Sequence, residues 1–207
     1  MGHYHHFIVL SFPAQGHINP ALQFAKLVLL TGARVTFVTS YSAKSRMENT
    51  SSAPAGLTFA PFSDGFDDGF KPNVAGRDNH LSEIKRIGSK FIPDLTANLA
   101  KEGRPITCIV YSPILPWAAQ LARELGVPSA LLWIQPATVF ILYYYYYHGY
   151  EAFMTSDQVE LPGLPLLTSK DVPSFFHDSK NPAFQLFPEQ FETLEQETKP
   201  WVLANHW

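Results

Sequence analysis

The sequence has very little cysteine: Cys108 is the only one among 207 residues. A single cysteine excludes an intrachain disulfide and is typical of a reducing compartment. Charge is also scarce, because Asp, Glu, Lys and Arg make up 16% of the chain and the formal net charge is −3. This balance gives no electrostatic reason to expect binding to nucleic acid or to an anionic membrane.

Long hydrophobic runs and targeting segments are missing as well. The longest apolar tract, residues 136–147, is too short to span a bilayer and includes the tyrosine run 143–147. No basic region followed by an apolar stretch opens the chain, so we expect no secretory signal. These features predict a cytoplasmic protein without a membrane span, in which the glycosylation sequon at Asn49 is unused.

Motifs for phosphate and metal binding are absent from the sequence. It contains neither G-x-G-x-x-G nor G-x-x-x-x-G-K-[ST], and neither H-E-x-x-H nor a cysteine pair. The acidic loop 64–70 lacks the ligand spacing of a calcium site and is interpreted as a turn-rich loop. His3, His5 and His6 are expected to form a polar N-terminal tail. We therefore expect no bound metal and no cofactor.

The pattern that remains is an alternation of apolar strands and helices in a chain that is 46% hydrophobic. It predicts an α/β protein with a Rossmann-like parallel sheet and helices on both faces. Strands are expected at 7–12, 34–39, 57–62, 106–111, 127–133 and 201–205, and helices at 20–30, 79–100, 116–125 and 136–150. Prolines concentrate in residues 161–188, which favours an irregular segment there. Residues 1–207 are expected to form one domain.

Three helix signals are specific. Asn19 and Pro20 suit the N-cap and first position of the first helix, and Gly32 suits its left-handed end. Pro93 should kink or split the helix that contains it. The tyrosine run would wrap all faces of its helix, and a packed helix with phenol ends in water is favoured over an aromatic recognition site.

The loops that follow parallel strands meet at one edge of the sheet, where ligands bind in such folds. Three of these loops would bring together His17, Ser112 and Gln135, an imidazole, a hydroxyl and an amide. Their other residues are apolar and include Phe12, Ile114, Leu115, Trp117 and Trp133. This composition is typical of a small-molecule site in which His17 could take a proton from the ligand. A capping or surface role for His17 is the alternative that position alone leaves open.

Several segments then point to a family. Residues 12–20, FPAQGHINP, resemble the opening motif of plant UDP-sugar glycosyltransferases, and residues 32–39 resemble their second strand. Residues 108–111, 115–117 and 128–137 are similar to one branch, which includes anthocyanin 5-O-glucosyltransferases and auxin and abscisate glucosyltransferases. Residues 64–69 and 160–165 fit the same branch. The resemblance extends over essentially the whole chain.

The resemblance implies the N-terminal half of a GT-B fold, in which two Rossmann-like domains face each other across a cleft. The N-terminal domain binds the acceptor, the C-terminal domain binds UDP-glucose as donor substrate, and the sugar is transferred with inversion and without a metal. His17 matches the general base. The acceptor is expected to be a hormone-type carboxylic acid or a flavonoid or anthocyanin hydroxyl. The expected acceptor-binding residues are Phe12, Pro13, Gln15, Gly16, Ile114, Leu115, Trp117, Trp133, Ile134 and Gln135.

The sequence departs from the family pattern at two points. Ser112 occupies the position where many members have an aspartate that holds the histidine, and a serine does not neutralise an imidazolium. The C-terminal donor-binding domain and its tryptophan-led motif are absent, so we expect the isolated chain to be inactive. A truncated, non-catalytic module that binds a small molecule or a partner protein stays open as the alternative. An unrelated nucleotide-binding Rossmann domain has little support without phosphate-binding glycines.

Overall fold

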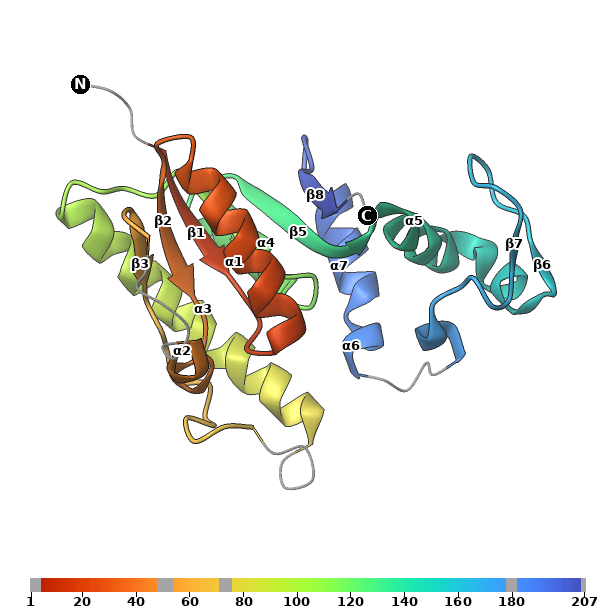
Figure 1. Ribbon diagram of the computed structural model, residues 1–207, viewed down its shortest axis with the longest axis horizontal. Coiled ribbons are helices and arrows are strands. Elements are labelled where there is room, and N and C mark those ends of the chain that lie inside the picture. The colour runs from red at the N-terminus through yellow and green to blue at the C-terminus, as the bar shows by residue number, and fades with distance from the viewer. Residues whose placement is uncertain (1–4, 48–53, 71–75, 178–181, 206–207) are drawn as a thin grey trace.

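The computed structural model describes residues 5–47, 54–70, 76–177 and 182–205. Its main feature is a six-stranded sheet with the order β3-β2-β1-β4-β5-β8, and all of the pairings in it are parallel (Figure 1). The strands are β1 (His6–Leu10), β2 (Arg34–Val38), β3 (Leu57–Phe59), β4 (Cys108–Tyr111), β5 (Ser129–Pro136) and β8 (Val202–Asn205). The predicted fold class is confirmed. The strand order reverses between β1 and β4, and ligands bind at such a point in open α/β sheets.

Helices cover both faces of this sheet. Helices α1 (Gln15–Leu29) and α2 (Tyr41–Met47) follow β1 and β2, whereas α3 (Arg77–Lys101) and α4 (Trp117–Glu124) pack on each other on the opposite face (Figure 1). Right-handed crossovers to the left and to the right of β1 produce this division. Each face has its own core, one centred on Val9, Val35 and Ala25, the other on Ile8, Ile109 and Trp133.

The first helix begins earlier than its sequence signals suggest. It starts at Gln15, its N-cap is Ala14 without a side-chain cap, and Pro20 lies inside it. The prediction that Asn19 caps the helix and Pro20 opens it is therefore wrong. The N–H groups of His17 and Ile18 bond to the Ala14 carbonyl, so a turn closes without a polar cap, and Pro20 removes only one later bond. As a result, His17 lies in the first turn of α1 instead of before it.

Other boundaries follow the prediction more closely. Gly32 has φ +81°, the left-handed conformation expected of a helix stop. At Pro93 the prediction of a split is wrong, because Pro93 lies inside α3, which runs without a break to Lys101. Helix α2 was not predicted, and the strand expected at 57–62 is short, although Phe62 still pairs with Ser40 in an isolated bridge. The sequon at Asn49 and the residue His3 lie outside the described residues.

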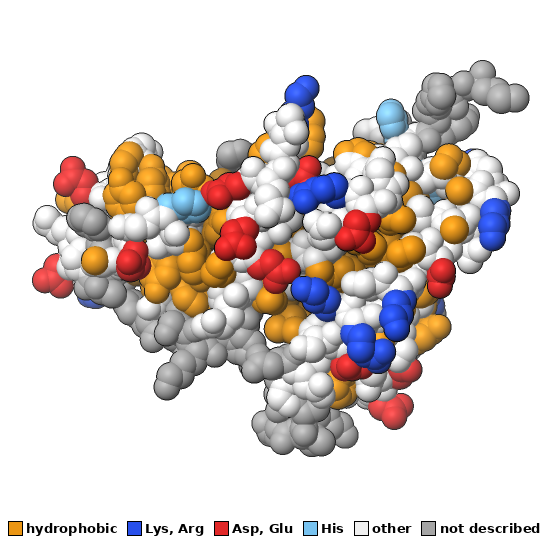
Figure 2. All heavy atoms as spheres, turned by 180° about the vertical axis from the view of Figure 1, so that it is seen from behind, with side chains coloured by type: hydrophobic (Ala, Val, Ile, Leu, Met, Phe, Trp, Pro, Cys, Tyr) orange, Lys and Arg blue, Asp and Glu red, His pale blue; other side chains and the backbone are white. Residues whose placement is uncertain are grey.

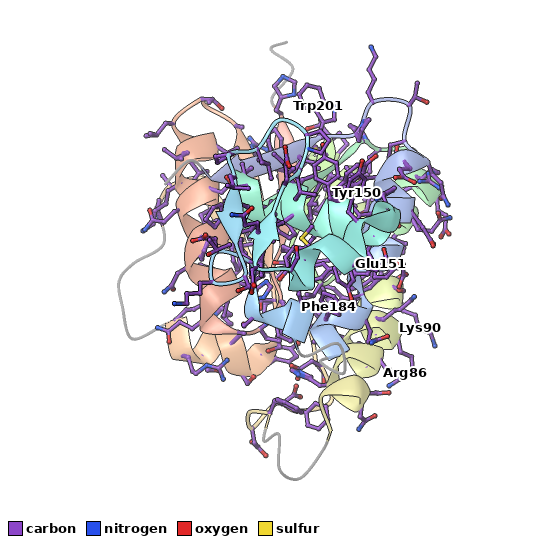
Figure 3. The ribbon with its side chains drawn as sticks, turned by 90° about the vertical axis from the view of Figure 1, so that its right-hand side faces the viewer. Arg86, Lys90, Tyr150, Glu151, Phe184 and Trp201 are labelled. Atoms are coloured by element: carbon purple, nitrogen blue, oxygen red, sulfur yellow. The ribbon has the colours of Figure 1, made fainter. Side chains whose placement is uncertain are left out.

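The end of the molecule formed by residues 137–195 packs beside the sheet. It contains α5 (Ala137–Tyr145), a π-helical turn (Tyr146–Tyr150), 3-10 turns at Glu151–Thr155 and Ser174–His177, the small antiparallel pair β6 (Gln158–Val159) and β7 (Leu167–Thr168), and helices α6 (Pro182–Gln185) and α7 (Phe187–Glu195). Figure 2 shows hydrophobic side chains gathered on this end. In Figure 3 this end faces the viewer, and Arg86 and Lys90 point outward from α3 behind it.

The tyrosine run of α5 holds the proline-rich segment in place. Tyr143 is fully buried, Tyr145 donates a hydrogen bond to the Pro162 carbonyl, and Tyr147 donates one to the Phe184 carbonyl. Tyr146 stacks on Phe176 with ring centroids 4.7 Å apart. The helix is packed, as predicted, but the hydroxyls of Tyr145 and Tyr147 bond to backbone carbonyls of residues 161–188. Tyrosines spread over all faces can therefore fasten a segment that has little regular structure of its own.

Candidate functional site

The carboxyl ends of β1, β4 and β5 bring the three predicted loops to one edge. β1 pairs with β4 from Phe7–Cys108 to Leu10–Tyr111, and β4 pairs with β5 up to Tyr111–Leu131. The loops that carry His17 and Ser112 therefore leave adjacent strands at the point where the strand order reverses. Gln135 lies farther along, at the end of the longer strand β5.

His17 is a partly buried imidazole without a hydrogen-bond partner at one nitrogen. Its Nδ1 atom is buried and has no partner among the described residues. The ring packs edge-on against Phe12, with centroids 5.3 Å apart. Burial lowers the pKa of His17 from 6.5 to about 4, because the apolar surroundings disfavour the charged ring. At neutral pH the ring is uncharged, so one of its two nitrogens carries a lone pair that can accept a proton.

Ser112 is buried directly after β4, and its hydroxyl group bonds to the backbone and not to His17. Its hydroxyl oxygen accepts a hydrogen bond from the Phe12 N–H at 3.3 Å. This contact ties the loop after β1 to the loop after β4 and so fixes the ring that packs on His17. A neutral hydroxyl occupies the position, so no carboxylate there raises the pKa of the imidazole.

A second histidine, paired with a carboxylate, also lies close to Phe12. His80 Nε2 and Asp64 Oδ2 are 2.9 Å apart, and both side chains are almost fully buried. The His80 ring lies 5.6 Å from the Phe12 ring. Burial acts to raise the pKa of Asp64, but hydrogen bonds from His80, the Phe66 N–H and Ser40 outweigh it and hold the pKa below its usual value. This pair anchors loop 64–70 to α3 near the site.

This pair was not predicted from the sequence, where Asp64 was expected only in a turn. The two residues lie 16 positions apart, in a loop and a helix, and no spacing rule connects them. A histidine on the core side of an amphipathic helix, as His80 is on α3, was the one available signal. His6, expected in a polar tail, is also a correction: it is the buried first residue of β1, and its ring bonds to Thr36 Oγ1 and the Arg104 carbonyl.

The residues predicted to bind the acceptor differ in how deeply they are buried. Ile114, Leu115, Trp117 and Trp133 are buried, and the Trp117 ring packs so closely on Gly88 that it secures α4 to α3. Pro13 is buried and its carbonyl accepts a bond from Arg46. Gln15 and Gly16 are exposed, and Phe12 and Ile134 are partly buried. A contact of any of these residues with an acceptor stays a prediction.

Two cavities lie along this side of the fold. One of about 450 Å³ is apolar, lies between α1 and strands β5 and β8, and is lined by residues that include Phe24, Trp133, Ile134 and Leu203. The other, of about 320 Å³, lies between the start of α5 and residues 171–174, and Gln135 and Tyr143 line it. Both have the size of small-molecule sites.

The described residues contain no cluster of three or more His, Cys, Asp or Glu side chains placed to hold a metal ion. Among the same residues, none of the helices is both long enough and apolar enough to cross a membrane.

Known proteins similar to this chain are plant sugar transferases. No family model matches it. It is 54% identical to a phloretin 4'-O-glucosyltransferase from Malus domestica, over 97% of this chain and 44% of the relative. It is 47% identical to an anthocyanidin 3-O-glucoside 5-O-glucosyltransferase from Perilla frutescens, over 96% of this chain and 44% of the relative. The chain thus spans a little under half the length of these curated relatives.

Solved structures agree in fold. Os79 from O. sativa, in complex with UDP, superimposes with a TM-score of 0.74 at 30% identity, over 95% of this chain and 45% of that one. A UDP-glucose: anthocyanidin 3-O-glucosyltransferase in complex with UDP gives a TM-score of 0.75 over 98% of this chain and 47% of that one, and at 19% identity it supports the fold alone. These neighbours are GT-B UDP-glycosyltransferases.

Proposed function

We infer that this chain, a homologue of plant UDP-glycosyltransferases along almost its whole length, is the acceptor-binding domain of a UDP-glucosyltransferase. Residues 1–207 form that domain, and a C-terminal domain supplies the binding site for UDP-glucose. The observation that carries the proposal is His17, an uncharged imidazole at the point where the strand order reverses. A cytosolic location and a small apolar acceptor belong to the same proposal.

The chemistry follows from the state of His17. The neutral ring of His17 accepts the proton of the acceptor's O–H group, the acceptor oxygen forms a bond to the anomeric carbon of glucose, and the bond from that carbon to the UDP oxygen breaks. UDP leaves with the electron pair and the configuration inverts. Because the His17 pKa of about 4 makes the ring a weak base, the proton should come from an acidic group. A phenol, with a reference pKa of about 10, fits this requirement better than an aliphatic alcohol, and a carboxylic acid, with a reference pKa of about 4, has already lost its proton at neutral pH.

Ser112 bears on the choice between these acceptors. A carboxylic acid is already ionised at neutral pH and needs little help from the base, so Ser112 should be tolerated best when the product is a glucose ester. We propose to compare Ser112→Asp with the parent in a full-length enzyme, on one carboxylate and one flavonoid phenol. Aspartate should increase the rate on the phenol more than on the carboxylate, and equal changes would contradict the idea.

Binding to this chain tests the wider proposal directly. Calorimetric titration with phloretin should give binding, and histidine ring signals in NMR should show His17 responding, whereas UDP-glucose should give neither. A His17→Ala variant identifies the signal. Phloretin binding that leaves His17 unaffected would contradict the assigned site, and glucosyl transfer by this chain alone would contradict the need for a second domain.

A further inference from the structure

Two residues that line the same cavity carry buried oxygens without hydrogen-bond partners. The hydroxyl of Tyr143 and the amide oxygen Oε1 of Gln135 are both buried, and neither has a hydrogen-bond partner among the described residues. Both residues line the cavity of about 320 Å³ beside the start of α5. Tyr143 is 0% exposed, so its hydroxyl cannot turn to bulk water. A buried polar group without a partner costs about 1–3 kcal/mol, and two on one cavity call for an explanation.

Packing alone does not require the Tyr143 hydroxyl. Its ring is held by Phe176 and Phe187, with centroids 5.2 Å and 4.4 Å away, and a phenylalanine would make the same contacts. The neighbouring tyrosines differ in this respect, because Tyr145 of α5 and Tyr147 of the following π-helical turn donate to the carbonyls of Pro162 and Phe184. Burial also raises the pKa of Tyr143, so the hydroxyl keeps its proton and can donate it to a hydrogen bond.

We propose that this cavity binds a hydroxyl group of the acceptor, remote from the oxygen that receives glucose. A hydroxyl satisfies both orphan atoms together: it donates to Gln135 Oε1 and accepts from the Tyr143 hydroxyl. The frame is apolar, formed by Pro136, Val139, Val172 and Pro173, which suits an aromatic ring. The ligand class is therefore a phenol with a second, distal hydroxyl. The inference rests on the proposed function and narrows its acceptor.

The cavity lies at the same edge of the sheet as His17. Gln135 lies near the end of β5, and His17 follows β1, two strands away in the sheet order. The carboxyl ends of both strands point to this edge, where ligands bind in such folds. A carboxylate fits the distal position poorly, because it has no proton for Gln135 Oε1 and Asp171 lies on the cavity rim. Hydrogen bonds from the backbone N–H and hydroxyl of Thr168 hold the pKa of Asp171 below its usual value and keep it charged.

The test compares two probes on this chain by calorimetry. One is phloretin, whose two rings both carry hydroxyls; the other is the analogue that lacks the lone hydroxyl of the less substituted ring. The parent chain should bind phloretin about tenfold more tightly, because the analogue leaves both buried atoms unsatisfied. Tyr143→Phe should reduce this preference to about threefold or less, and adding Gln135→Met should abolish it. Tyr144→Phe is the matched control, since Tyr144 is exposed and stacks on His148.

The thermal stability of the empty chain distinguishes a ligand-binding role of the Tyr143 hydroxyl from a purely structural one, because loss of a structural hydroxyl would lower the stability. Removing an unsatisfied hydroxyl should leave the midpoint of thermal unfolding of the empty Tyr143→Phe chain unchanged or higher. A fall of the midpoint together with an unchanged probe preference would overturn the inference. Equal binding of both probes by the parent would overturn it while leaving the proposed function intact, whereas binding of neither probe would contradict both.

Discussion

The buried imidazole of His17 makes the stability of the chain depend on pH in a calculable way. The pKa of an unperturbed histidine is 6.5, and burial lowers that of His17 to about 4 in the fold. Between these values the unfolded chain binds more protons than the folded chain, so stability is complete above pH 6.5 and is lost as the pH falls toward 4. From pH 7 to pH 5, His17 alone should lower the free energy of unfolding by about 2 kcal/mol.

Comparison with a His17→Leu variant isolates this contribution. Burial also lowers the pKa of His6, and hydrogen bonds lower that of Asp64, so parent and variant share a further loss of stability in acid. Urea unfolding at several pH values should show the parent losing about 2 kcal/mol more than the variant between pH 7 and pH 5. NMR titration of the His17 ring in the folded parent should give a midpoint near 4. Parallel losses in the two proteins, or a midpoint near 6.5, would refute the reasoning.

Three further predictions concern the surroundings of the site. His80→Leu should destabilise the fold by about 3–5 kcal/mol in urea unfolding, because it leaves the Asp64 carboxylate buried without its histidine partner. The double variant with Asp64→Leu should recover much of this loss. If it recovers none, the two residues do not stabilise the fold as a pair. Gly88→Ala should lower the free energy of unfolding by about 1–3 kcal/mol in thermal unfolding, because the new Cβ would lie 2.6 Å from the Trp117 ring. The reference variant is Ala100→Gly on the same helix, which should lower it by about 1 kcal/mol or less. Burial raises the pKa of the Cys108 thiol to about 11, so the native chain should react slowly with a thiol reagent at pH 8 and the unfolded chain rapidly; equal rates would exclude burial as the control.

The sequence predicted the alternation of elements well because buried parallel strands leave continuous apolar runs. The prediction from the sequence was wrong at the start of α1, where two possible helix starts lie close together. Asn19 and Pro20 form a good start for a helix, yet backbone bonds to Ala14 begin the helix earlier, and no pattern of residue types reports that choice. At the site, topology and the family motif both pointed to His17 and Ser112. The low pKa of His17 and the pairing of Asp64 with His80 depend on burial and on contacts between distant segments, which a single sequence does not encode locally.

The central place of β1 in the sheet has a consequence for synthesis. β1 is the first strand in the described chain and pairs with β4, and the backbone N–H of His6 bonds to Thr107 Oγ1 across 101 residues. At translation rates of about 5–20 residues per second, β4 emerges roughly 5–20 s after β1. During that interval β1 has one open edge and α1 lacks its later contacts with β5. The nascent segment that carries His17 is thus made well before β4 and β5, which complete its surroundings, and it is the part that chaperones should engage.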